Sequence, residues 1–428
     1  MITHLVEAFA VRRLPRRRPA ASCSEGAEMQ RDRAMERIGA GDGERPPRRL
    51  LIVSADMGEG HNATGRALQE AAEGTWPGVQ VRWLDTLRAM GPGVGPVLRS
   101  LYSTNVRHLP WLYQFLYDQI RRRRWFADSS KHVIGAWAGR RLAMPLAEWT
   151  PDAIVCTYPM GTAGLAWLRS HRGLRTPIGA WVSDFAPHPF WVFRDVDLTL
   201  VMHEVAVPIA EDLVPGARLA VSGPPVRASF HPAPRPPARR RLGLPEQAFV
   251  AVVSGGSLGF GDVASAARAV LDADPGAIAA VVCGHNEHVH RQLLREGDHG
   301  GHLRALGWVD DMPALLVAAD LVLTNAGGAT ALEALASGRP ILMYHPIAAH
   351  GRANAALMAA AGLTEVCESP IELTAAVRRL RAEPDRLAAR ERAAIAYARR
   401  GSVADGLRSL LEAASRPSSG AVAQADSG

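Results

Sequence analysis

The chain has 428 residues, of which 47% are hydrophobic and 21% charged, and its net charge is +7. This length and composition are typical of two or three globular domains, and no apolar run approaches the ~20 residues that cross a bilayer. Eleven arginines and seven acidic residues in the first 49 positions account for four of the seven charges. The charge therefore does not indicate a nucleic-acid-binding surface, which requires basic residues interleaved with aromatic ones.

The start of the chain and the cysteines indicate a cytoplasmic protein. In the first 20 residues the charge follows the apolar stretch, the reverse of a secretory signal. Cys23, Cys156, Cys283 and Cys367 lie far apart and form no C-x-x-C pair, which favours a reducing compartment over a zinc site or a disulfide framework. We expect a disordered basic arm at 1–48 and a disordered tail at 416–428.

From residue 49 onward, apolar runs alternate with glycine-containing turns and helical segments. The expected strands occupy residues 50–55, 79–85, 153–159, 177–185 and 197–203, and then 249–256, 278–284, 303–309, 321–328 and 340–346. Near-continuous apolar strands that alternate with helices predict parallel sheets covered on both faces. Residues 224–246, between the two groups, are rich in proline and arginine and indicate a linker outside the core. The sequence predicts an α/β protein with two doubly wound domains, 49–223 and 247–415, facing each other across a cleft.

In open α/β sheets ligands bind beyond the carboxyl ends of the strands, so the loops there are candidate sites. The stretch "SGGSLGFGD" (residues 254–262) follows a strand and precedes a helix, and paired glycines at a helix N-terminus suit a phosphate. It is neither the G-x-G-x-x-G dinucleotide fingerprint nor a P-loop. A phosphate-binding loop and a structural tight turn both remain open for this stretch.

A second glycine pair, Gly327 and Gly328, also follows a strand and precedes a helix. Thr330 falls in the first turn of this helix and Glu333 one turn further along. A carboxylate at Glu333 can accept hydrogen bonds from the two vicinal hydroxyls of a ribose. Taken alone, Glu333 is better explained as a solvated helix residue.

Residues 324–358 as a whole resemble the donor-binding signature of GT-B glycosyltransferases. They are similar in particular to the monogalactosyldiacylglycerol synthases and processive diacylglycerol glucosyltransferases, and more distantly to the lipid-linked N-acetylglucosamine transferase of peptidoglycan assembly. The matching positions are Gly327, Gly328, Thr330, Glu333, Ala334, Gly338, Pro340, Asn354 and Ala355. Two features differ from the family: Asn325 replaces a lysine, and Ala349-His350-Gly351 replaces a Gly-Gln-Glu whose polar groups contact the donor sugar.

The first domain contains a loop similar to one in this family. The stretch "GEGHNATGRAL" (residues 58–68) is glycine-rich and places His61 at the mouth of the expected cleft. An imidazole there has the right pKa range to accept a proton from an acceptor hydroxyl. Without the match in the second domain, a loop or capping histidine would be the better interpretation.

A second block of the first domain, residues 181–204, also matches the family. The matching positions are Ser183, Asp184, His188, Trp191, Val196 and Asp197, and residues 223–230 match a further family stretch. Asp184 ends a strand, so its carboxylate can act as a base or orient His61. Asp195-Val196-Asp197 resembles an Asp-x-Asp metal motif, but it lies at a strand start in the wrong architecture, and we predict no metal site.

The resemblance covers roughly residues 50–385. It implies the GT-B fold of two Rossmann-like domains, a UDP-sugar as co-substrate, an inverting single displacement, and neither an obligate metal nor a cofactor. His61 or Asp184 would be the catalytic base. The implied donor-binding residues are Gly255, Gly256, Ser257, Gly259, Trp308, Val309, Asn325, Gly327, Gly328, Thr330, Glu333, His350 and Asn354. The implied acceptor-binding residues are Gly58, Gly60, His188 and Trp191.

Residues 111–125 combine aromatic and basic side chains. Leu112, Phe115, Leu116 and Ile120 fall on one helical face, Tyr113, Tyr117 and Trp125 lie beside it, and Arg121–Arg124 follow. This combination suits a helix in an anionic membrane interface, and an amphipathic helix packed on the first sheet explains it equally well. Membrane docking in the related family favours peripheral association with the inner face of the cell membrane.

The predicted activity is transfer of a hexose from a UDP-sugar to a lipid hydroxyl, with diacylglycerol favoured as the acceptor. A polyprenyl-linked or small-metabolite acceptor is the alternative within this class. Asn325, His350 and Gly351 leave open a catalytically weakened sugar-nucleotide-binding protein. An NAD enzyme is disfavoured by the missing fingerprint, and no nucleic-acid partner is expected.

Overall fold

The computed structural model describes residues 46–416. The arm predicted at 1–48 and the tail predicted at 416–428 therefore lie almost wholly outside the described residues, as does Cys23. Cys156, Cys283 and Cys367 are buried free thiols.

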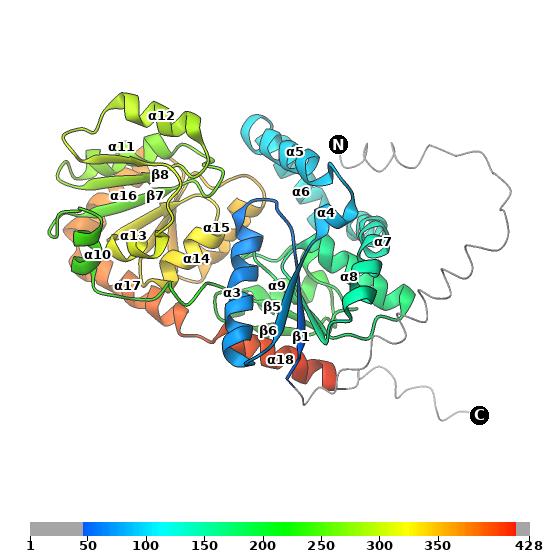
Figure 1. Cartoon of the computed structure of the whole chain (residues 1–428). Helices are drawn as coiled ribbons and strands as arrows, with labels where there is room; N and C mark the ends of the chain where they lie inside the picture. The colour runs from blue at the N-terminus through cyan, green and yellow to red at the C-terminus, as the bar shows by residue number, and fades with distance from the viewer. Residues whose placement is uncertain (1–45, 417–428) are drawn as a thin grey trace, which may run out of the picture.

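Two parallel sheets of six strands each form the centres of two domains (Figure 1). The first sheet has the order β2-β1-β3-β4-β5-β6 and the second the order β12-β11-β10-β7-β8-β9. The first contains β1 (Arg49–Ser54), β2 (Gln80–Asp85), β3 (Ala153–Cys156), β4 (Ile178–Trp181), β5 (Leu198–Val201) and β6 (Leu219–Val221). The second contains β7 (Val250–Ser254), β8 (Ile278–Val282), β9 (Leu303–Leu306), β10 (Leu321–Thr324), β11 (Ile341–Tyr344) and β12 (Thr364–Cys367). The predicted fold class is confirmed.

Helices cover both faces of each sheet, as continuous apolar strands require. Those that follow the strands of the first sheet are α3 (Glu59–Thr75), α4 (Thr86–Met90), α5 (Val94–His108), α6 (Pro110–Arg122), α7 (Arg124–Trp149), α8 (Pro159–Arg172) and α9 (Val207–Leu213). Those that follow the strands of the second sheet are α11 (Val263–Ala273), α12 (Glu287–Glu296), α13 (Met312–Ala318), α14 (Ala329–Ala336), α15 (His350–Ala360), α16 (Pro370–Ala382) and α17 (Pro384–Ala398). In each domain the loops after the central strands point toward the other domain.

Two short edge strands, β6 and β12, are absent from the sequence prediction. β6 has only three residues, all half-buried or exposed, and so short an apolar run does not by itself mark a strand. In β12, Glu365 pairs with Arg379 and Arg390 on the helices beside it. The apolar run of β6 is short, and Thr364 and Glu365 leave β12 without one, so neither has the continuous apolar signal of a central strand.

Residues 224–246, predicted as a linker outside the core, contribute to the second domain. Phe230 is buried in the core of that domain, and α10 (Arg235–Arg241) packs beside α13. Arg239 of this helix is buried and pairs with Asp320 at 2.6 Å. Pro236 and Pro237 fit because they occupy the first turn of α10, where backbone N–H groups need no helical partner.

The last helix, α18 (Val403–Ser415), packs against the first sheet, so the second domain ends before residue 415, where the prediction placed its end. Figure 1 shows α18 in red beside the blue and green elements of the first domain. Leu407 and Leu410 are buried in one core with Trp181. The chain therefore crosses between the domains twice, and the two crossing segments meet at Gly223 and Gly401, where a Cβ on Gly223 would overlap the Gly401 carbonyl.

Candidate active site

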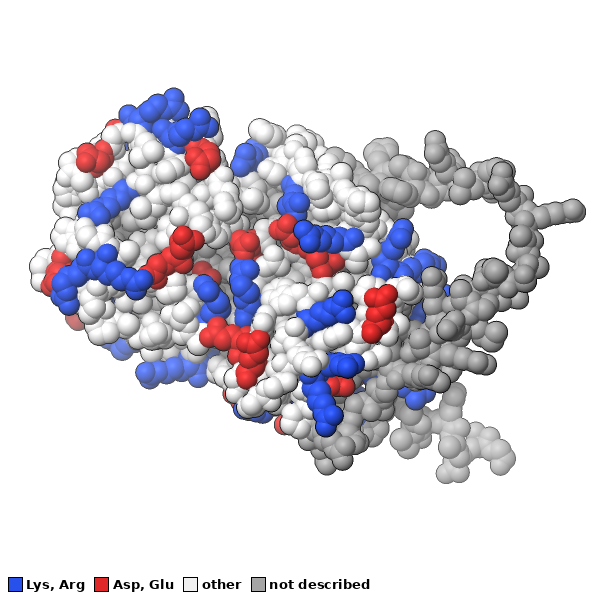
Figure 2. Space-filling model, in the orientation of Figure 1, with Lys and Arg blue, Asp and Glu red and all other residues white. Residues whose placement is uncertain are grey.

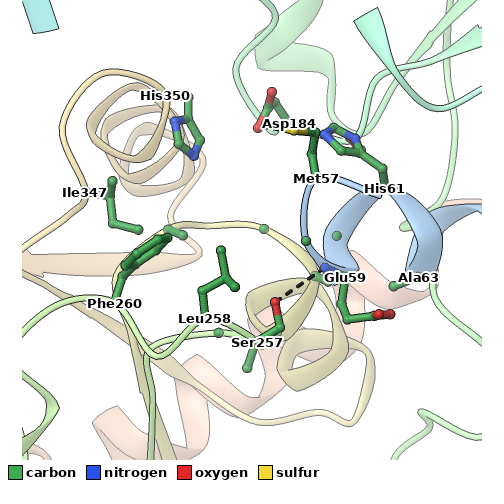
Figure 3. A pocket seen from close by; sticks show the side chains of 18 of the residues that line it. Met57, Glu59, His61, Ala63, Asp184, Ser257, Leu258, Phe260, Ile347 and His350 are labelled. Carbon is green, nitrogen blue, oxygen red and sulfur yellow. Dashed lines mark hydrogen bonds between the residues drawn. The ribbon is translucent and has the colours of Figure 1, made fainter. Parts of the chain in front are cut away.

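A cavity of about 890 Å³ lies between the two domains and is lined by loops that follow strands of both sheets. Predicted site residues that line it are Gly58, Gly60, His61, Asp184, His188, Gly255, Gly256, Ser257, Trp308, Val309, Gly328, Thr330, Glu333 and His350. In Figure 3, His61 and Asp184 from the first domain face His350, Ile347 and Phe260 from the second. Residues more than 280 positions apart in the chain thus share one cavity.

The glycine-rich loops of the two domains touch at one side of this cavity. The backbone N–H of Glu59 donates to Ser257 Oγ at 3.4 Å, as the dashed line in Figure 3 shows. Gly58 has φ +117°, a conformation that favours glycine, and a Cβ on it would face the same serine at 3.7 Å. The domains are therefore in contact at the start of α3, the helix that carries His61.

His61 is held by its Nδ1 atom, which lies 2.8 Å from the Thr157 carbonyl oxygen and 2.9 Å from Ser183 Oγ. Because a carbonyl can only accept, Nδ1 carries the proton and Nε2 keeps its lone pair. Among residues 46–416 no hydrogen bond occupies Nε2. Burial lowers the pKa of His61, while Asp184 and the Thr157 carbonyl counteract part of that effect. The imidazole is therefore neutral near pH 7 and able to take up a proton.

Both oxygens of the Asp184 carboxylate accept hydrogen bonds. The indole Nε1 of Trp191 donates to Oδ2 at 2.8 Å, and the amide Nδ2 of Asn354 donates to Oδ1 at 3.2 Å. Burial raises the pKa of Asp184, but His350, His188 and the Trp191 N–H together lower it by more than burial raises it. The pKa of Asp184 therefore lies below its ordinary value. Asp184 is therefore an ionised, fixed carboxylate next to His61.

His350 bridges the domains at the other side of the cavity. Tyr113 Oη lies 3.2 Å from its Nδ1, and Tyr102 Oη lies 3.5 Å from its Nε2. The backbone N–H of Ala349 also donates to Gln114 Oε1 at 2.7 Å. Burial lowers the pKa of His350, partly opposed by Asp184. The first turn of α15 is thus bound to the α5–α6 pair of the first domain.

His188 and the tyrosines give this part of the cavity an aromatic wall. The ring of Tyr117 meets His188 edge-on at 5.8 Å, and Tyr102 meets Tyr113 in the same way at 6.0 Å. Burial lowers the pKa of His188 to about 4, although Asp184 opposes it. The sequence prediction missed Tyr102, and it placed Tyr113 and Tyr117 beside the apolar face of a surface helix. The spacing of four residues between Tyr113 and Tyr117 indicates that they share one face of α6, and this spacing could have identified them as cavity residues.

The glycine loop after β7 has the left-handed backbone that its sequence suggests. Gly256 has φ +74°, and backbone hydrogen bonds close a turn from Gly256 to Gly259. A Cβ on Gly259 would lie 2.5 Å from the Cys283 carbonyl oxygen, so this glycine is required by packing and does not line the cavity. The loop leads into α11 only at Val263.

Glu333 lies on α14, whose N-terminus follows Gly327 and Gly328. Burial raises its pKa to about 7, with Arg227 and Arg66 acting in the opposite direction. Both arginines line the cavity and were not predicted as site residues. Arg66 also forms an ion pair with Glu59. The cavity therefore contains a carboxylate on which two guanidinium groups act electrostatically.

At the outer end of the cavity, Trp308 stacks on His285 with ring centroids 4.2 Å apart and planes at 7°. Trp308 is 49% exposed, and its Nε1 donates to Asp310 Oδ1 at 3.1 Å. A half-exposed, stacked indole has one free face that can take a flat aromatic ring.

Five predicted site residues lie behind the cavity wall: Gly259, Trp191, Asn325, Gly327 and Asn354. Asn325 is buried and donates from Nδ2 to the Phe260 carbonyl at 2.6 Å. Trp191 and Asn354 bind Asp184, as described above. Gly327 has φ +65°, and a Cβ on it would lie 2.8 Å from the Asn354 Cβ. These residues therefore support the cavity wall and do not line it, and their predicted contacts with the donor or acceptor stay predictions.

The described residues contain no group of three or more His, Cys, Asp or Glu side chains that could hold a metal ion. Asp197, in the Asp-x-Asp stretch, pairs with Arg169 at 2.7 Å and accepts from the Ile178 N–H at 2.8 Å. Its carboxylate therefore joins the start of β4 to the start of β5.

Helix α6 presents two different faces. Tyr113, Leu116, Tyr117 and Ile120 line the cavity, whereas Trp111 and Phe115 are 68% and 54% exposed. Trp125, after the turn, is 65% exposed. The helix packs mainly against α5 and α7, and the predicted apolar face is divided, because Leu116 and Ile120 line the cavity while Phe115 is exposed.

Charged residues are distributed without a dominant sign on the face shown in Figure 2, where basic and acidic side chains are interspersed over both domains. Between residues 46 and 416, none of the helices has both the length and the apolar character needed to cross a membrane.

The chain is similar to known proteins in both domains. Residues 61–226 match the family model described as monogalactosyldiacylglycerol (MGDG) synthase, and residues 250–405 match the glycosyltransferase family 28 C-terminal domain. The processive diacylglycerol β-glucosyltransferase of Bacillus subtilis (strain 168) is 26% identical over 347 residues, which cover 79% of this chain and 88% of that protein. The chloroplastic monogalactosyldiacylglycerol synthase of Spinacia oleracea is 28% identical over 346 residues, 77% of this chain and 66% of that protein.

Solved structures share the two-domain fold at low sequence identity. MurG of Acinetobacter baumannii is 16% identical with a TM-score of 0.52, over 86% of this chain and 99% of that one. The calicheamicin glycosyltransferase CalG4 is 17% identical with a TM-score of 0.53, over 85% and 98%. The arrangement of two facing Rossmann-like domains is therefore that of these proteins.

Proposed function

The chain is a GT-B glycosyltransferase related to the monogalactosyldiacylglycerol synthases and processive diacylglycerol glucosyltransferases, and from this premise we propose that it transfers a hexose from a UDP-sugar to a hydroxyl of diacylglycerol. The observation that carries the proposal is the state of His61. Its tautomer leaves a lone pair on Nε2, in a cavity that both domains line. A general base must have this free lone pair, within reach of the acceptor.

In the proposed reaction, His61 Nε2 accepts the proton of the acceptor hydroxyl while the oxygen attacks the anomeric carbon of the sugar. The bond from that carbon to the UDP oxygen breaks, and its electron pair leaves with UDP. Attack opposite the leaving group inverts the anomeric configuration. Asp184, ionised and fixed by two donors, stabilises the imidazolium that forms.

His61 is a better candidate base than Asp184. Each oxygen of Asp184 already accepts a hydrogen bond, and its pKa lies below the ordinary value, so it has little affinity for a proton. His61 is neutral and has an unoccupied nitrogen.

The second domain would hold the UDP portion of the donor. The turn at Gly255–Ser257 and the N-terminus of α14 after Gly328 offer backbone N–H groups to the diphosphate. Glu333 would accept hydrogen bonds from the ribose, and the free face of Trp308 would stack on uracil. The hexose would then lie between His350 and the His61–Asp184 pair.

The acceptor would enter from the side of α6. The helix lines the cavity with one face and exposes Trp111 and Phe115 on another. With Trp125 and Arg121–Arg123, all exposed, these residues form a surface that suits the interface of an anionic membrane. Peripheral binding to the inner face of the cell membrane would present the lipid hydroxyl at the cavity mouth.

The experiment is UDP release by purified protein with UDP-glucose, UDP-galactose or UDP-N-acetylglucosamine, with and without diacylglycerol in anionic vesicles. Lipid-dependent release that falls about 10²–10⁴-fold in His61→Ala, with UDP affinity kept, supports the proposal, and the anomeric proton coupling of the product tests inversion. Binding of UDP without release for any pair would refute the acceptor assignment. Unchanged release in His61→Ala would refute the role of the base.

A further inference from the structure

Asn354 contacts both domains although it does not line the cavity. Its side chain is fully buried, one helical turn after His350 on α15. The amide Oδ1 accepts from the Ala186 N–H at 2.8 Å, and Nδ2 donates to Asp184 Oδ1 at 3.2 Å and to the Ala326 carbonyl at 3.1 Å. Ala186 and Asp184 belong to the first domain, and Ala326 to the glycine turn before α14 in the second.

The partners fix the orientation of this amide. The Ala186 N–H can only donate and the Ala326 carbonyl can only accept, so the oxygen must face the first and the NH2 group the second. The remaining N–H then points at Asp184. No rotation of the side chain satisfies all three partners in another way.

The surrounding backbone leaves room for this contact. A Cβ on Gly327 would lie 2.8 Å from the Asn354 Cβ, so only a residue without a side chain lets the turn come this close. The φ of +65° at Gly327 is also unfavourable for other residues. The packing of Asn354 thus accounts for a glycine at position 327, and the diphosphate contact suggested by the sequence stays a prediction.

We propose that Asn354 is a positioning residue for Asp184; this inference rests on the proposed function. Through this contact, the carboxylate beside the His61 base has its full set of hydrogen bonds only when the second domain is closed against the first. A buried carboxylate needs hydrogen-bond donors to remain ionised. Of the two donors, Trp191 belongs to the first domain and Asn354 to the second. Separation of the domains removes the Asn354 donor, so Asp184 has both only in the closed arrangement.

Other titratable groups also face this pair. They are His61 on α3, His188 after β4, His350 on α15, and the tyrosines Tyr102, Tyr113 and Tyr117 on α5 and α6. Asn354 differs from all of them because it hydrogen-bonds Asp184 from the other domain and cannot itself titrate.

The test is Asn354→Asp, which keeps an oxygen for the Ala186 N–H and replaces the donor to Asp184 by a second carboxylate. Added negative charge raises the proton affinity of His61. We expect kcat for UDP release to fall about 10- to 100-fold and the acid limb of the pH profile to move up by about one unit. The Kd for UDP should change by less than threefold. Thr364→Val, which removes a buried hydrogen bond to Ile341 elsewhere in the second domain, is the control and should keep the wild-type profile.

A second readout does not require transfer activity. The imidazole of His61, followed by NMR with labelled histidine, should titrate at higher pH in Asn354→Asp than in wild type. An unmoved His61 midpoint and acid limb, or a loss explained wholly by weaker UDP binding, would overturn the positioning role. If wild-type protein releases no UDP with any substrate pair, the proposed function fails, and the His61 midpoint still decides the inference.

Discussion

Asp184→Asn separates the charge of this side chain from its shape. The carboxylate accepts one hydrogen bond on each oxygen, from Trp191 and from Asn354. An amide has a single accepting oxygen, so its NH2 group must face one of these two donors. Loss of one charge-assisted hydrogen bond, with a donor left facing a donor, lowers the free energy of unfolding by about 2–4 kcal/mol. The neutral amide also cannot stabilise the His61 imidazolium, which lowers kcat about 10²–10⁴-fold.

Urea unfolding measures the first effect, and UDP release with saturating donor and lipid measures the second. Asp195→Asn is the matched control, because Asp195 lies in the same block but is exposed, and it should keep activity within threefold and stability within about 0.5 kcal/mol. If Asp184→Asn keeps wild-type kcat, the charge beside His61 is not part of the reaction. If it keeps wild-type stability, the two hydrogen bonds do not hold Asp184.

The other predictions concern stability, pH and the membrane. The folded-state pKa of Glu333, about 7, lies above its ordinary value of 4.5, so its protonation favours the folded protein and wild-type stability falls as pH rises from about 4.5 through 7. Glu333→Gln should raise the free energy of unfolding at pH 8 by about 1–2 kcal/mol while weakening UDP binding; equal urea midpoints at pH 8 would contradict the burial of this charge. Gly327→Ala should cost about 1–3 kcal/mol, seen as a lower Tm, because its φ and the nearby Asn354 Cβ both oppose a methyl group; an unchanged Tm would count against this packing. Trp111→Ser with Phe115→Ser should reduce sedimentation with anionic vesicles at least fivefold without changing Tm, and equal binding would exclude this face of α6.

The sequence was sufficient for the fold class because the central strands are continuously apolar and each is followed by a helix. It was insufficient for β6, which has only three residues, and for β12, whose sequence begins with Thr364 and Glu365. It was also insufficient for residues 224–246, where Asp320 and three backbone carbonyls hold the buried Arg239. An ion pair between positions 81 residues apart leaves no local pattern.

The cavity residues were largely predictable because parallel strands bring their following loops to one edge. Roles behind the wall were not predictable, because Trp191, Asn325 and Asn354 share motifs with residues that line the cavity. Only the distances separate a side chain that faces the cavity from one that holds another in place, as Asn354 does for Asp184.

The position of α18 makes the second domain, topologically, an insertion within the first. A ribosome delivers β1 to β6 first, but Leu407 and Leu410, the side chains that cover Trp181, emerge only after the whole of the second domain. The domain that carries His61 therefore completes its core after the domain that would hold the nucleotide. Loss of the residues after Arg400 would therefore damage the first domain, although these residues follow the second domain in the sequence.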